Sequence, residues 1–252
     1  MSELTYAIGD VHGCHDLLLD LLDGIAKHAA GRPHKLVFLG DYIDRGPDSA
    51  AVVHTVRTLQ QSSPGSVICL LGNHEAMLLN AVTDPRVFDL WLRNGGDTAL
   101  ASFGAKSARD LPEDVVGWLK SLPTFYETGR HYFVHAGVNP AKPLARQEDR
   151  DRLWIREPFL GSSHNFGKHI VHGHTPLQSG IPDEQPYRTN LDTGAAYGGA
   201  LTAGVFSDAQ DGAIAYLQVS DRDVSSKPAD RTQDGAGVPR EGAWPRIKRL
   251  RW

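Results

Sequence analysis

Three stretches within the first 75 residues decide the fold: LTYAIGD at residues 4–10, KLVFLGD at residues 35–41 and SVICLLGNHE at residues 66–75. Each is a β-prone apolar run that ends at a glycine, and a polar residue able to bind a metal follows that glycine. Apolar residues recur at helical spacing after Asp16 and again after Pro47. The resulting β-α-β-α-β order predicts right-handed crossovers and a largely parallel sheet.

The rest of the chain changes character twice. Apolar residues at helical spacing predict helices over about residues 84–122. Short β-type runs then alternate with Gly and Pro turns and predict a second sheet, with strands at residues 132–135, 169–171, 188–191, 201–206 and 213–219. Large apolar residues become rare after Asp221 and return at the C-terminal end. We therefore predict a catalytic domain at residues 1–220 and a C-terminal extension at residues 221–252.

Composition excludes some classes of function. The 252 residues include 26 Lys and Arg against 30 Asp and Glu, a net charge of −4 that argues against a nucleic-acid partner. Two cysteines cannot form a disulfide scaffold, and neither a signal peptide nor an apolar run long enough to span a membrane is visible. The expectation is a cytoplasmic protein with no membrane partner.

Candidate metal ligands follow the predicted strands. Asp10 and His12 come after the first, Asp41 after the second and Asn73 after the third, and the later strands are followed by His135, His172 and His174. Because ligands bind at the carboxyl ends of strands in open α/β sheets, these loops are expected to converge on one crevice. The adjacent glycines allow tight turns and a close approach of the backbone.

The residue types favour two divalent metal ions. Carboxylate oxygen combined with imidazole nitrogen suits Mn, Fe or Zn better than Ca or Mg. A single Asp between two cations can bridge them. We expect Mn as the metal, with Fe or Zn as alternatives.

Five segments, in this order, resemble the signature of the metallophosphoesterase superfamily: GDVHG (9–13), GDYIDRG (40–46), LLGNHE (70–75), HAG (135–137) and HGHT (172–175). GDYIDRG with GNHE resembles the bacterial and phage branch of the phosphoprotein phosphatase family of serine/threonine phosphatases. Residues 94–98 and 153–156 are also similar to that branch. The resemblance covers about residues 5–206 and implies an α/β fold, with two facing mixed β-sheets flanked by helices.

The resemblance also implies a role for each site residue. It assigns the first metal to Asp10, His12 and Asp41, and the second metal to Asp41, as the bridge, with Asn73, His135 and His174. His74 would be the general acid for the leaving alkoxide, and Asp44 would hold its imidazole and favour the protonated form. Arg45, Arg156 and Asn73 would bind the phosphate. A metal-bound hydroxide would attack phosphorus directly, without a covalent phosphoenzyme.

The expected substrate is a phosphoserine or phosphothreonine in a protein. Pro176 occupies the position where related nucleases carry a second histidine, which argues against nuclease activity. Asp44 is usually absent from the symmetrical dinucleoside tetraphosphatases, so its presence favours phosphomonoesters. Hydrolysis of dinucleoside tetraphosphates is one alternative. A catalytically inactive, metal-dependent binding module is another, although the complete ligand set argues against it. The sequence does not fix the oligomeric state.

Overall fold

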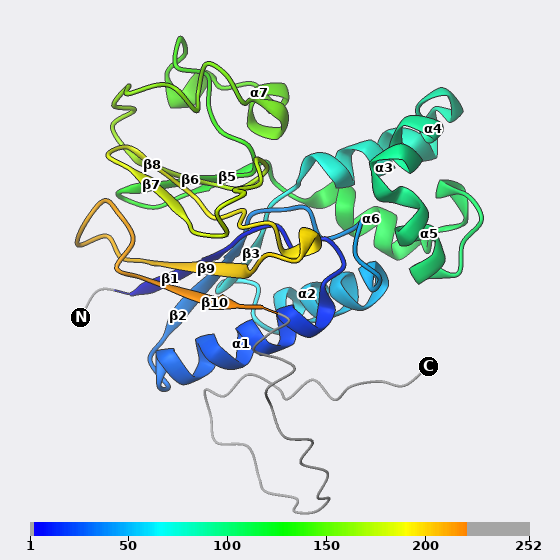
Figure 1. The fold of residues 1–252 in the computed structure, drawn as a ribbon, viewed down its shortest axis with the longest axis horizontal. Helices are drawn as coiled ribbons and strands as arrows, with labels where there is room; N and C mark the ends of the chain where they lie inside the picture. Colours follow the sequence, from blue (N-terminus) through cyan, green and yellow to red (C-terminus); the bar gives the residue numbers. More distant parts are fainter. Residues whose placement is uncertain (1–2, 221–252) are drawn as a thin grey trace, which may run out of the picture.

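The computed structural model describes residues 3–220, so the predicted extension at residues 221–252 lies outside the described part of the chain. Two five-stranded mixed sheets face each other and helices cover their outer sides, which confirms the predicted α/β sandwich (Figure 1). The strands are β1 (Leu4–Ile8), β2 (His34–Phe38), β3 (Val67–Cys69), β4 (Phe125–Glu127), β5 (His131–Val134), β6 (His169–His172), β7 (Asp183–Gln185), β8 (Arg188–Asn190), β9 (Leu201–Phe206) and β10 (Ala215–Val219). The α-helices are α1 (His15–Ala29), α2 (Ser49–Ser62), α3 (Asn73–Thr83), α4 (Phe88–Trp91), α5 (Asp97–Phe103), α6 (Glu113–Ser121) and α7 (Asp149–Trp154).

The first sheet has the strand order β10-β9-β1-β2-β3. Strands β1, β2 and β3 are parallel, as the β-α-β-α-β order predicts, and α1 and α2 are the crossovers. Strands β9 and β10 also belong to this sheet, where they run antiparallel to β1 and to each other. Their assignment to the second sheet was therefore wrong. Both strands return to the sheet edge beside β1, a pairing between distant parts of the chain.

The second sheet has the strand order β4-β5-β6-β8-β7. Its three central strands are parallel, and the outer strands β4 and β7 are antiparallel to their neighbours. The sequence patterns missed β4 and β7, which have three residues each and are partly exposed, so they lack a buried apolar run. The carboxyl ends of β5 and β6 lie at the same end of the sandwich as those of β1 and β2.

Alternation along the strands explains how the two layers pack. In β1, Tyr6 and Ile8 point into the core beneath α1 and α2, whereas Ala7 points into the layer between the sheets. Phe133 of β5 and Phe206 of β9 fill the same inter-sheet layer, with ring centroids 5.9 Å apart. Because these strands are buried on both faces, their sequences are continuous apolar runs rather than alternating ones.

The helices that follow β3 build a wall beside the first sheet (Figure 1). Helix α3 begins at Asn73, and residues 84–122 are largely helical, as predicted. Helix α1 begins at His15, so the Asp16 carboxylate lies in its first turn. Within residues 3–220 the longest helix has 15 residues, and none is both long and apolar enough to cross a membrane.

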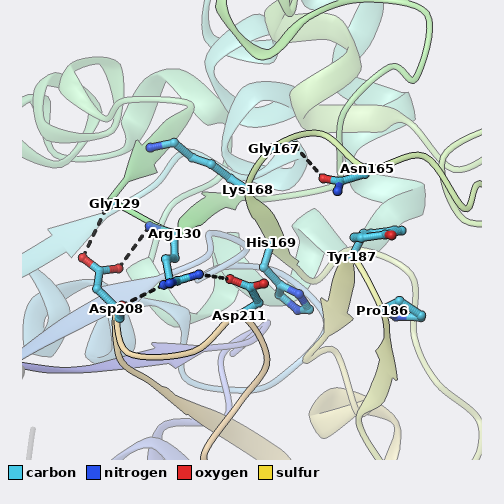
Figure 2. A pocket seen from close by; sticks show the side chains of 10 residues that line it. All are labelled: Gly129, Arg130, Asn165, Gly167, Lys168, His169, Pro186, Tyr187, Asp208 and Asp211. Carbon is cyan, nitrogen blue, oxygen red and sulfur yellow. Dashed lines mark hydrogen bonds and ion pairs between the residues drawn. The ribbon is translucent and has the colours of Figure 1, made fainter.

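A cavity of about 520 Å³ opens at the amino ends of β5, β6 and β8, the end opposite to the predicted ligand loops (Figure 2). Arg130 donates to the side chain of Asp211 at 2.9 Å and to the backbone oxygen of Asp208 at 2.8 Å. The Asp208 carboxylate accepts from Thr128 Oγ1 at 2.7 Å. These contacts fasten the β9–β10 turn to the second sheet and satisfy the charges around the cavity.

His169 at the start of β6 makes stability depend on pH. Burial lowers the pKa of this ring to about 4. The unfolded chain binds a proton near pH 6.5 while the folded chain binds it only near pH 4, so the free energy of unfolding falls as pH drops through this window. We expect His169→Gln to reduce the slope of unfolding free energy against pH by about one proton, measured by urea titration. Equal slopes for the wild type and His169→Gln would contradict this assignment.

Candidate metal centre

The loops at the carboxyl ends of β1, β2, β5 and β6 converge with the start of α3. Asp41, His135 and His174 each place one ligand atom within 4.8 Å of the others, and all three are buried. Asn73 Oδ1 lies 2.8 Å from His135 Nε2 and 2.8 Å from His174 Nδ1. The four residues predicted to hold the second metal are therefore brought together.

Backbone contacts fix the orientation of two of the histidines. His12 Nδ1 donates to the Ile43 oxygen at 2.7 Å, and His135 Nδ1 donates to the Leu39 oxygen at 3.0 Å. Each Nε2 then presents a lone pair toward Asp41, at 3.3 Å for His12 and 3.4 Å for His135. Carbonyl groups commonly orient metal-binding histidines in this way. In His135 that lone pair also faces the Asn73 oxygen, an arrangement of two acceptors that a cation would satisfy.

The predicted first metal group is less compact. His12 and Asp41 form a group with His74, the predicted general acid, rather than with Asp10. The Asp10 carboxylate instead accepts from the backbone N–H of His174, at 3.1 and 3.2 Å. It lies directly against Gly173, where an added Cβ would collide with Asp10 Oδ1. Asp10 is thus at the site but joins neither group of closely spaced ligand atoms.

The buried charges fit divalent cations. Among residues 3–220, the five buried acidic side chains all belong to this region, namely Asp10, Asp41, Asp44, Glu75 and Asp192. Burial, reinforced by the charges of Asp192 and Asp41, raises the pKa of Asp10 well above its usual value. Buried carboxylates need cationic partners, and His174 Nε2 is buried without a hydrogen-bond partner. The residues present therefore fit a dinuclear site.

Glu75 holds the loop that carries Asp41. Its Oε1 accepts from the backbone N–H groups of Tyr42 at 2.8 Å and Ile43 at 3.2 Å. Its Oε2 accepts from the N–H groups of Asp41 at 2.9 Å and Gly72 at 3.0 Å. Burial and the charge of Asp41 raise the pKa of Glu75 to about 8. The four amide donors nevertheless leave no room for a carboxyl proton, so we treat Glu75 as a carboxylate.

His74 and Asp44 form a buried dyad. Asp44 Oδ2 lies 2.7 Å from His74 Nδ1, and Trp91 Nε1 donates to both carboxylate oxygens at 2.9 and 3.1 Å. Burial lowers the pKa of His74 to about 3 and raises the pKa of Asp44 well above its usual value. Burial therefore disfavours the charged imidazole, whereas the pairing with Asp44 is expected to favour it.

The two predicted phosphate-binding arginines lie at the rim of the metal centre. Arg45 Nη1 contacts His12 Nε2, and the Arg45 guanidinium carbon lies 5.2 Å from the centre of the Tyr197 ring. Arg156 is exposed and lies close enough to His174 to lower the pKa of its ring, although burial is the main cause of that shift. Both arginines thus border the pair of metal-binding groups.

Three residues at the site escaped sequence reasoning. Trp91 was identified only as an apolar residue at helical spacing, although its N–H holds Asp44. Asp192 follows β8 in the same way that Asp10 follows β1, a signal that could have identified it. Trp154 is 44% exposed, and its ring centre lies 6.3 Å from that of His174. His172, which also follows a predicted strand, packs against Phe159 with ring centroids 5.0 Å apart.

We expect Glu75→Gln to lower the unfolding free energy by roughly 2–4 kcal/mol, because the amide NH2 group would face two backbone N–H donors from which it cannot accept a hydrogen bond. Metal affinity should fall with it, since Asp41 loses its support. Urea unfolding and isothermal titration with Mn²⁺ measure the two effects, with the exposed Glu113→Gln as the matched control. Wild-type stability and affinity in Glu75→Gln would show that the loop does not depend on this carboxylate.

Comparison with known proteins places this geometry in a family. Residues 5–201 match the calcineurin-like phosphoesterase family. Serine/threonine-protein phosphatase 1 of Salmonella typhimurium is 32% identical over 209 residues, which cover 79% of this chain and 89% of that enzyme. A symmetrical bis(5'-nucleosyl)-tetraphosphatase of a Janthinobacterium species is 37% identical over 139 residues, 54% of this chain and 44% of that enzyme.

A solved structure of a proposed diadenosine tetraphosphatase has a TM-score of 0.64 and 26% identity, and the match covers 86% of this chain and 94% of that one. The relatives thus divide between a serine/threonine-protein phosphatase and dinucleoside tetraphosphatases. The family match spans every loop that contributes to the metal centre. The chain belongs to the calcineurin-like phosphoesterase family and is a metallophosphoesterase.

Proposed function

We propose that this chain hydrolyses phosphoserine and phosphothreonine monoesters in proteins. The observation that carries the proposal is the buried His74–Asp44 pair, joined at 2.7 Å and held by Trp91. A serine or threonine alkoxide is a poor leaving group and needs a proton as the P–O bond breaks. A phosphoanhydride releases a much weaker base, so a positioned acid contributes less to its hydrolysis.

His74 is proposed as the group that supplies this proton. In the free protein, burial favours the neutral ring. The dianionic phosphate of a bound substrate would add negative charge beside the imidazole and favour its protonated form. Asp44 keeps Nδ1 engaged, so Nε2 is free to face the leaving oxygen. Nε2 already points toward the centre of the site, 3.9 Å from Asp41 Oδ2.

Arg45, Arg156 and Asn73 are proposed to hold the phosphate oxygens that do not react. A planar guanidinium can donate two parallel hydrogen bonds to a phosphate. When bound, a pair of divalent ions supplies Lewis acidity to the phosphate oxygens and acidifies a nearby water. The proposed ligands are Asp10, His12, Asp41, Asn73, His135 and His174, and Mn is the proposed metal.

Hydrolysis of dinucleoside tetraphosphates is the second candidate. The similarity to a symmetrical bis(5'-nucleosyl)-tetraphosphatase supports it. Product analysis on a phosphothreonine peptide and on bis(5'-adenosyl) tetraphosphate separates the two activities. The proposal requires a higher kcat/KM for the peptide, and a preference for the dinucleotide would overturn it.

Removing the metal should abolish activity and lower stability. After chelation, readdition of Mn²⁺ should restore hydrolysis of nitrophenyl phosphate and raise the melting temperature, because binding to the folded state adds about 2.7 kcal/mol at 100 times Kd. Fe²⁺, Zn²⁺ and Mg²⁺ are the parallel additions, and Mn²⁺ is expected to restore the most activity. Full activity at a measured metal content of zero would exclude a metal-dependent reaction.

We expect His74→Asn to lower kcat on a phosphothreonine peptide by roughly 10²–10⁴-fold, the usual contribution of a general acid. The loss should be smaller on nitrophenyl phosphate, whose leaving group needs less protonation. The exposed His54→Asn is the matched control. Equal losses on both substrates would contradict the general-acid role, and loss of metal measured by elemental analysis would instead identify His74 as a metal ligand.

A further inference from the structure

A second cavity, of about 730 Å³, lies beside the metal centre. Two loops form its walls: one follows β6 and the other follows β8. Both loops begin at residues of the site, because Pro176 is two residues after His174 and Thr193 directly follows Asp192. The lining residues are Pro176, Leu177, Gln178, Ser179, Gly180 and the 193–199 loop with its Tyr197, closed at one end by Ser220.

Side-chain contacts connect this cavity to the proposed phosphate position. Tyr197 is 63% exposed and lines the cavity, and its ring centre is 5.2 Å from the guanidinium carbon of Arg45. Arg45 in turn contacts His12 in the metal centre. A substrate whose phosphate is held by Arg45 therefore has the cavity as the adjoining space on that side.

Among the described residues that line the cavity, none carries a charged side chain. The lining combines the apolar Leu177, the aromatic face of Tyr197, the amide of Gln178, and hydroxyl and backbone groups. A charged group that entered this space would lose water without gaining an ion pair, which is unfavourable. An uncharged side chain of moderate size would lose much less hydration free energy on entering the cavity.

We propose that this cavity binds the substrate residues next to the phosphorylated serine or threonine and selects uncharged ones. The inference rests on the proposed function and adds the substrate class to it. The lining favours a peptide over a dinucleoside tetraphosphate. After one phosphate is held at the metal centre by Arg45, the remaining phosphates of the dinucleotide would lie against lining residues that, among those described, carry no charge.

Gln178 provides the test, because it is exposed on the cavity wall and lies outside the proposed catalytic machinery. Three phosphothreonine peptides would differ only in their flanking residues, which are alanine and serine, glutamate, or lysine. The wild type should show a kcat/KM about fivefold or more higher on the neutral peptide than on either charged one.

The charge variants form a matched pair. Gln178→Lys should raise kcat/KM on the glutamate peptide and lower it on the lysine peptide, and Gln178→Glu should do the reverse. Neither variant should change the kcat/KM for nitrophenyl phosphate by more than about twofold, because that substrate has no flanking residues. This crossed pattern at constant ionic strength would support the subsite.

The results that would overturn the subsite differ from those that would overturn the proposed function. Hydrolysis of all three peptides with equal kcat/KM, or without a crossed response, would overturn the subsite and leave the proposed function standing. Turnover of nitrophenyl phosphate without hydrolysis of any peptide would overturn both. A response of bis(5'-adenosyl) tetraphosphate hydrolysis alone to the Gln178 variants would identify a nucleotide as the occupant and overturn the peptide assignment.

Discussion

The metal centre depends on the hydrogen bonds that the Glu75 carboxylate accepts from the backbone. This carboxylate joins the start of α3 to the loop after β2 through four backbone amides, from Asp41, Tyr42, Ile43 and Gly72. These amides have no strand or helix partner, and without an acceptor they would be buried at a cost of about 1–3 kcal/mol each. A single side chain therefore satisfies the backbone of both loops. As a result, Asp41 is fixed between two groups of candidate ligands.

Backbone strain shows how strongly the surrounding fold determines this region. Six residues other than glycine have a positive φ within residues 3–220, and five of them belong to the site: His12, Asp41, Asp44, Arg45 and His174. Such conformations cost about 1–3 kcal/mol each and persist only when neighbouring structure enforces them. The apolar layers beneath α1 and between the sheets provide that enforcement, because they fix the strand ends from which these loops leave. Stability and site geometry are thus coupled through the core.

Much of the fold and of the metal centre could be predicted from the sequence, because the sequence signals for them are local. Buried parallel strands give apolar runs, and the ligands follow those runs directly, so the parallel strands and the convergence of Asp41, His135 and His174 were accessible. Features that depend on pairing between distant parts of the chain could not be predicted in this way. Strands β9 and β10 joined the first sheet because of contacts with β1. The low pKa of His74 results from burial, which no motif reports.

The buried carboxylates explain why this fold and its chemistry are inseparable. Asp10, Asp41 and Asp192 are within electrostatic range of one another and of the Arg45 guanidinium. Their mutual repulsion opposes the compact state, and bound divalent ions would remove it. The groups that prepare the site for metal are therefore the ones that make the metal-free domain less stable. Metal binding and folding share the same free energy, so a substitution that weakens the Asp41 loop affects both together.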